Sequence, residues 1–81
     1  MEPEQKIKKV VETVLEEMFP GGGWITGECY RSNDGVPKLY YLDYTLPDPI
    51  KKARMEFTQE ELTKKSDTYL EESAVDQIES S

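Results

Sequence analysis

The side chains best suited to chemistry gather in one stretch, residues 24–46, which reads WITGECYRSNDGVPKLYYLDYTL. This stretch holds the only tryptophan, the only cysteine, four of the five tyrosines and the carboxylates Glu28 and Asp43. Two neighbouring carboxylates can shift each other's pKa and perform acid–base catalysis. Such a pair needs a pocket, which the face of a small sheet rarely provides, so we rank an enzyme built on Glu28 and Asp43 last.

Other catalytic and metal-binding residue types are scarce. The chain has no histidine, which is the commonest general base and transition-metal ligand. Its single cysteine, Cys29, cannot form a cysteine-rich zinc site and has no histidine to activate it as a nucleophile. No spacing of acids matches a calcium loop. We therefore expect no enzymatic activity, no catalytic residues, no metal and no cofactor.

Two β-rich segments flank Asn33-Asp34-Gly35, a sequence typical of a hairpin turn. A two-residue turn at Asp34 and Gly35 predicts a ribbon with one apolar and one mixed side. The apolar side pairs Ile25 with Tyr44, Gly27 with Leu42, and Cys29 with Tyr40. The mixed side pairs Thr26 with Asp43, Glu28 with Tyr41, and Tyr30 with Leu39, and it places Trp24 near Thr45.

The mixed side is the candidate functional surface. Its large residues include Trp24, Tyr30 and Tyr41, with Glu28 beside them. Aromatic residues with a few polar neighbours are typical of protein-binding surfaces. A helix that covered this side would give the same aromatics a packing role instead. The sequence leaves both interpretations open, and we assign Trp24, Glu28, Tyr30 and Tyr41 to protein interaction.

The elements around the hairpin are predicted from periodicity. Apolar residues at spacings of three and four predict a helix over residues 4–18 that buries one face; they are Ile7, Val10, Val11, Val14, Leu15 and Met18. The same stripe would also suit a dimer seam, but it spans only two heptads. Residues 50–57 alternate and favour a third strand, although Asp48 and Pro49 would also suit the start of a helix. Thr58-Gln59-Glu60-Glu61 is a capping box, which predicts that the second helix begins at Gln59.

The chain's charge is unevenly distributed. The formal net charge is −7, and residues 66–81 contain five acids and no base. We therefore divide the chain into a core domain, residues 1–65, and an acidic C-terminal helix extension or partly disordered tail, residues 66–81. The excess of acids makes direct binding to nucleic acid unfavourable. No apolar run approaches the ~20 residues of a membrane span, no signal-peptide block is visible, and a single cysteine suits a reducing compartment. We expect a cytoplasmic protein.

Together these patterns predict a small α+β domain of order α-β-β-β-α, with a three-stranded antiparallel sheet and its helices packed on one face. The predicted apolar face comprises Ile25, Cys29, Tyr40, Leu42, Tyr44, Met55 and Phe57. For function, we expect a small acidic interaction or regulatory module that binds a protein partner through its sheet. The alternative is an acidic inhibitor of the virus or phage type that mimics nucleic acid and occupies a nucleic-acid-binding protein. A homodimer would also supply burial that so short a chain lacks.

Overall fold

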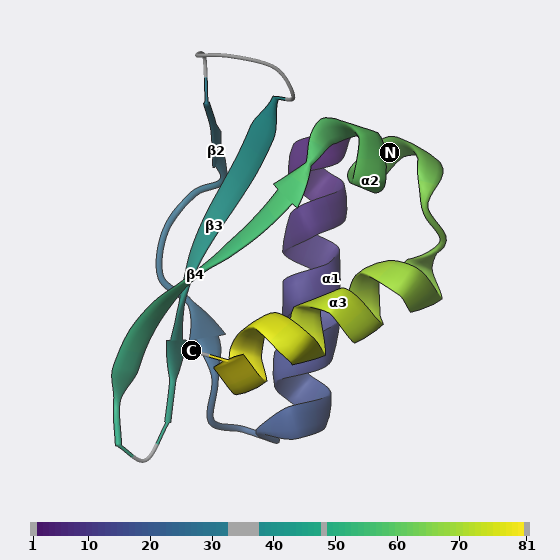
Figure 1. Cartoon of the computed structure of the whole chain (residues 1–81). Coiled ribbons are helices and arrows are strands. Elements are labelled where there is room, and N and C mark those ends of the chain that lie inside the picture. Colours follow the sequence, from purple (N-terminus) through teal and green to yellow (C-terminus); the bar gives the residue numbers. More distant parts are fainter. Residues whose placement is uncertain (1, 33–37, 48, 81) are drawn as a thin grey trace.

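A computed structural model describes residues 2–32, 38–47 and 49–80. In chain order the elements are α1 (Pro3–Met18), β1 (Trp24–Ile25), β2 (Tyr30–Arg31), β3 (Leu39–Leu46), β4 (Lys51–Thr58), α2 (Gln59–Lys64) and α3 (Asp67–Ser80). They form a small α+β domain with an open antiparallel sheet (Figure 1). The predicted fold class is confirmed. Its first strand is divided into β1 and β2, and its last helix into α2 and α3.

The sheet is organised around β3. On one side β4 pairs with β3 along its whole length, from Leu39 opposite Thr58 to Leu46 opposite Lys51. On the other side β1 and β2 pair with opposite ends of β3. Residues 51–58 are therefore a strand, as the alternating pattern favoured, and the helical alternative for this segment is wrong.

The predicted register is confirmed for β1 and wrong for β2. Trp24 lies across from Thr45 and Ile25 from Tyr44, as predicted. At the other end of β3, Tyr30 lies across from Tyr41 and Arg31 from Tyr40. These pairings replace the predicted ones of Cys29 with Tyr40, Glu28 with Tyr41 and Tyr30 with Leu39. The predicted pair of Gly27 with Leu42 is not part of the observed register either.

The cause is the segment between β1 and β2, residues 26–29, which is two residues longer than the part of β3 that it spans. Glycine weakens a strand and often marks a bulge, and Gly27 lies in this segment. Because side chains alternate, an insertion of two residues leaves each later side chain on its predicted face. Tyr30 therefore still shares a face with Tyr41. The predicted turn at Asp34 and Gly35 lies outside the described residues.

The capping box forms as predicted at the junction of β4 and α2. The Thr58 hydroxyl accepts the backbone N–H of Glu61 at 3.0 Å, and the Glu61 carboxylate accepts the backbone N–H of Thr58 at 3.0 Å. The helix then ends at Lys64. After a break at Lys65 and Ser66, a new helix begins, and the Ser66 hydroxyl accepts the N–H of Tyr69 at 3.2 Å.

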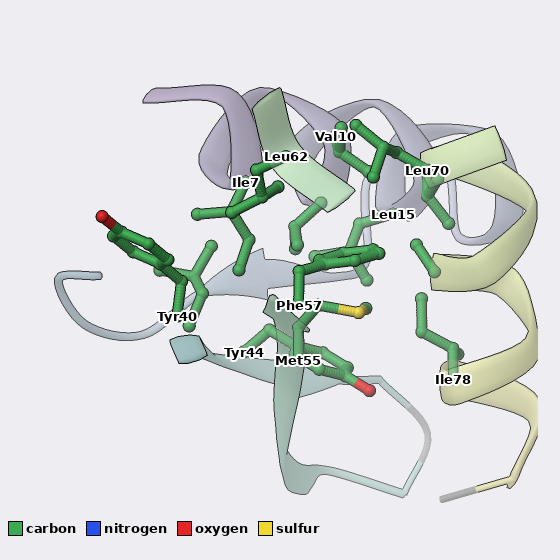
Figure 2. Packing of buried hydrophobic residues seen from close by; sticks show 14 residues of the cluster. Ile7, Val10, Leu15, Tyr40, Tyr44, Met55, Phe57, Leu62, Leu70 and Ile78 are labelled. Carbon is green, nitrogen blue, oxygen red and sulfur yellow. The ribbon is translucent and has the colours of Figure 1, made fainter. Parts of the chain in front are cut away.

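The core lies between the sheet and the helices, and all three helices contribute to it (Figure 2). Of the predicted apolar face, five residues are at most 3% exposed, while Ile25 and Cys29 are partly buried beside them. The full set of buried apolar residues is Ile7, Val10, Val11, Val14, Leu15, Tyr40, Leu42, Tyr44, Met55, Phe57, Leu62, Leu70, Ala74 and Ile78. Periodicity therefore located the parts of the core that α1, β3 and β4 contribute.

The acidic segment is integrated into this packing through α3. Leu70, Ala74 and Ile78 recur every four residues and are buried. At its N-terminus, α3 is tied to α1 by an ion pair between Lys6 and Asp67. Residues 67–80 are therefore a helix whose apolar stripe faces the core and whose acids lie mainly outside. No helix within the described residues is long and apolar enough to cross a membrane.

Candidate functional site

The sheet has one face covered by helices and one open face. The buried residues of α1 and α3 share one cluster with Leu42 and Met55, so both helices lie on that side (Figures 1 and 2). Alternation turns Tyr41 and Asp43 of β3, and Arg54 of β4, to the opposite side. No helix in the described part of the chain covers this open face. The question left by the sequence, whether a helix covers the mixed side, is thereby answered for these residues.

An aromatic–arginine cluster, made of Tyr30, Tyr41 and Arg54, occupies the open face. The rings of Tyr30 and Tyr41, on neighbouring strands, have centroids 5.4 Å apart and are tilted by 31°. The guanidinium carbon of Arg54 lies 5.1 Å from the Tyr30 ring centroid and 5.5 Å from that of Tyr41. These distances are within cation–π range. Tyr30 remains 41% exposed, so the cluster offers a preformed aromatic surface to solvent.

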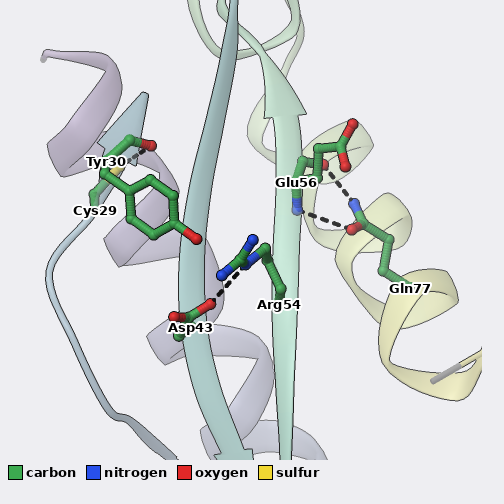
Figure 3. Close-up of polar contacts among 6 residues, drawn as sticks. All are labelled: Cys29, Tyr30, Asp43, Arg54, Glu56 and Gln77. Carbon is green, nitrogen blue, oxygen red and sulfur yellow. Dashed lines mark hydrogen bonds and ion pairs between the residues drawn. The ribbon is translucent and has the colours of Figure 1, made fainter. Parts of the chain in front are cut away.

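Asp43 fixes the arginine in this position. Arg54 lies directly across from Asp43, and its Nε donates to Oδ1 of Asp43 at 2.9 Å (Figure 3). That hydrogen bond raises the pKa of the Arg54 guanidinium, which is charged at neutral pH as arginines are in general. A planar guanidinium held against two rings can stack on a further aromatic group or donate to a carboxylate of a partner. Arg54 was not among the predicted site residues; its place follows only once β4 is paired with β3.

A hollow of about 440 Å³ opens beside the cluster. It is lined by Thr26, Asp43, Lys52, Ala53 and Arg54. Thr26 reaches it because its backbone N–H donates to the carbonyl of Asp43 at 3.1 Å, which continues the pairing of β1 beyond Ile25. The open face therefore carries a hollow as well as aromatic groups, and both cationic and anionic side chains line this hollow.

Trp24 lies apart from the cluster. It is opposite Thr45, four residues along β3 from Tyr41, which corresponds to about 13 Å. Trp24 is 48% exposed and lines a second hollow, of about 440 Å³, between α1 and β1. Leu15 and Ile25 supply apolar lining there. The structure thus brings Tyr30 and Tyr41 together and places Trp24 at the other end of the sheet.

Glu28 is exposed in the segment that joins β1 to β2 and makes no hydrogen bond or ion pair with another described residue. Asp43, its proposed catalytic partner, is instead engaged by Arg54. The two carboxylates are therefore in different settings: one solvated on an irregular segment, the other held in an ion pair on a central strand. This arrangement offers no shared proton between them.

Cys29 is partly buried, and its pKa is raised first by burial and then by the nearby carboxylate of Glu4. A raised pKa reduces the thiolate fraction and hence the reactivity of the sulfur. Across the described ranges, no three side chains of the types that bind metals come together as a metal-binding group.

The chain matches no protein-family model, no curated protein sequence and no solved structure in comparisons with known proteins. We therefore infer the function from the fold and from the chemistry of its surfaces.

Proposed function

We propose that this protein is a small, acidic, non-enzymatic module that binds a protein partner through the open face of its sheet. The observation that carries the proposal is the exposed aromatic–arginine cluster on a face that no described helix covers. Tyrosine, tryptophan and arginine are the residues that dominate binding energy at protein interfaces. Tyr30 and Tyr41 are held by their strands and by each other, so little conformational entropy is lost when they are covered.

In this proposal the cluster is the centre of the interface, and Trp24 and Glu28 lie towards its edges. The ion pair of Arg54 with Asp43 keeps the guanidinium oriented before the partner arrives. Such preorganisation reduces the free-energy cost of association. A regulatory role would follow from competition for the partner, and no catalytic step is assigned to the protein.

The test begins with capture of the partner from cells by the tagged protein and its identification by mass spectrometry. The purified partner is then titrated with wild-type protein and with the double variant Tyr30→Ala/Tyr41→Ala. We expect at least about tenfold weaker binding, as for the loss of an interface hot spot. The matched control is Tyr69→Ala, because Tyr69 is 42% exposed but lies on α3, away from the open face. Unchanged affinity of a folded double variant would refute the proposal.

A second candidate function is inhibition of a nucleic-acid-binding protein by charge mimicry. It is supported by α3, where the exposed acids Glu72, Asp76 and Glu79 are spaced to lie along one side of the helix. Neutralising them together (Glu72→Gln, Asp76→Asn and Glu79→Gln) should abolish competition with nucleic acid. Deleting residues 67–81 is not a suitable test, because it would also remove the buried stripe of α3 from the core.

A further inference from the structure

The outer edge of β4 carries backbone groups that point away from β3. The N–H of Glu56 donates to the side-chain oxygen of Gln77 at 3.0 Å, and its carbonyl accepts from the Gln77 amide nitrogen at 2.8 Å (Figure 3). One glutamine side chain on α3 therefore pairs with this edge as a strand would. The next outward N–H, that of Thr58, is satisfied by Glu61. Half of the edge is thus closed by the chain's own side chains.

The other half of the edge is open. Outward-pointing groups alternate along an antiparallel strand, so the alternation that includes Glu56 and Thr58 also includes Lys52 and Arg54. No donor or acceptor among the described residues meets the backbone N–H and C=O groups of these two residues. An unpaired strand edge of this kind is a template for one more strand.

Charge indicates what fits this edge. Lys51, Lys52 and Arg54 are exposed on it, and Asp43 balances only the arginine. Pairing with a second copy of the chain would place Lys52 and Arg54 against the same residues of the copy, and like charges directly opposite are destabilising. An acidic segment meets no such repulsion. The side chains of Lys52 and Arg54 also line the hollow on the open face, where a side chain of an added strand can be received.

We propose that β4 binds an extended acidic segment of a protein partner, which adds to the sheet as an antiparallel strand beside Lys52 and Arg54. Residues of the segment opposite these two exchange four backbone hydrogen bonds with β4. Their side chains fall on the open face, so acids at alternate positions lie beside the two cations. This inference deepens the proposed function, on which it rests, by naming the partner's chemistry.

The probe is a labelled peptide of about eight residues that alternates glutamate and valine, a composition suited to strands. Binding is measured by fluorescence anisotropy. One control peptide carries lysine in place of glutamate, and the other is methylated on the backbone nitrogens of its glutamates. Each control should bind at least about tenfold more weakly, the first through charge and the second through lost hydrogen bonds.

Protein variants locate the site. Lys52→Pro removes an outward N–H that β3 does not use, which an edge strand tolerates, and should weaken peptide binding at least about threefold. Lys52→Gln should also weaken it, whereas Lys64→Gln, at an exposed lysine on α2, should not. Peptide binding should also slow hydrogen exchange at the amides of Lys52 and Arg54.

Absence of saturable binding would overturn the inference, as would equal binding of the methylated peptide to the wild-type protein. The peptide comparison needs no variant and remains decisive if Lys52→Pro fails to fold. A dimer whose formation protects the amides of Lys52 and Arg54 would make a second copy the occupant and overturn the inference too. If the peptide fails while partner binding still depends on Tyr30 and Tyr41, only this inference falls. Partner binding whose affinity is unchanged when those tyrosines are replaced would refute the proposed function itself.

Discussion

Replacing Leu70 with alanine tests whether α3 belongs to the cooperative fold. Leu70 is fully buried, next to Ala74 and Ile78 along the same helical stripe. Truncation of a buried leucine to alanine costs about 2–5 kcal/mol, because apolar contacts are lost and a cavity remains. A domain of this length has a free energy of unfolding of about 4–12 kcal/mol. A loss near 3 kcal/mol is therefore a large fraction of the total and should lower Tm by about 12–24 °C.

The assay is urea unfolding followed by two signals. Far-UV circular dichroism reports on the helices, and fluorescence reports on Trp24, the only tryptophan, which lies on β1. If α3 is part of one cooperative unit, both signals shift together to lower urea in the Leu70→Ala variant. The control Glu72→Ala, at an exposed position of the same helix, should stay within about 0.5 kcal/mol of wild type. An unchanged midpoint in Leu70→Ala, or loss of helix without a fluorescence change, would show that α3 lies outside the cooperative unit.

Three further predictions concern stability. The hydrogen bond and charge of Lys6 lower the pKa of Asp67. The resulting stabilisation of the fold is complete at pH values above the ordinary aspartate pKa of about 4, and it disappears as the pH falls through the lowered pKa. Asp67→Asn should therefore unfold earlier than wild type in urea at neutral pH but not in strong acid. Thr45 is 2% exposed and its hydroxyl meets no described partner, so Thr45→Val should raise stability by about 1 kcal/mol in the same titration; a clear loss would show that the hydroxyl is bonded. A Cβ at Gly22 would lie 2.9 Å from the Pro47 ring, whereas one at Gly27 would meet nothing within 4 Å. Gly22→Ala should thus lower Tm and Gly27→Ala should not; equal Tm values would contradict this.

Sequence patterns predicted the parts of the fold that depend on local periodicity. The stripe on α1, the alternation along β4 and the capping box at Thr58 each specify an element through neighbours within a few residues, and all three are confirmed. Side-chain alternation also placed Tyr30 and Tyr41 on one face despite the wrong register of β2. An insertion of two residues shifts partners but preserves parity.

Other features depend on contacts between distant parts of the chain. The extra residues at 26–29 are recognised only against β3, because Gly27 alone is compatible with a continuous strand. Arg54 enters the cluster through its pairing with Asp43, 11 positions earlier in the sequence. Gln77 closes the edge of β4 at Glu56, 21 positions away, and no local pattern marks it. The role of α3 in the core could not be predicted from local sequence patterns, because acids and polar residues surround its short apolar stripe.

We propose above that a protein partner binds over the aromatic–arginine cluster. The most direct measurement is a titration of isotope-labelled protein with the purified partner, followed by backbone amide shifts in NMR spectra. We expect the largest shifts at Tyr30, Tyr41 and Arg54, on the open face of the sheet. Shifts confined to the acidic side of α3, around Glu72 and Asp76, with the open face unchanged, would contradict it.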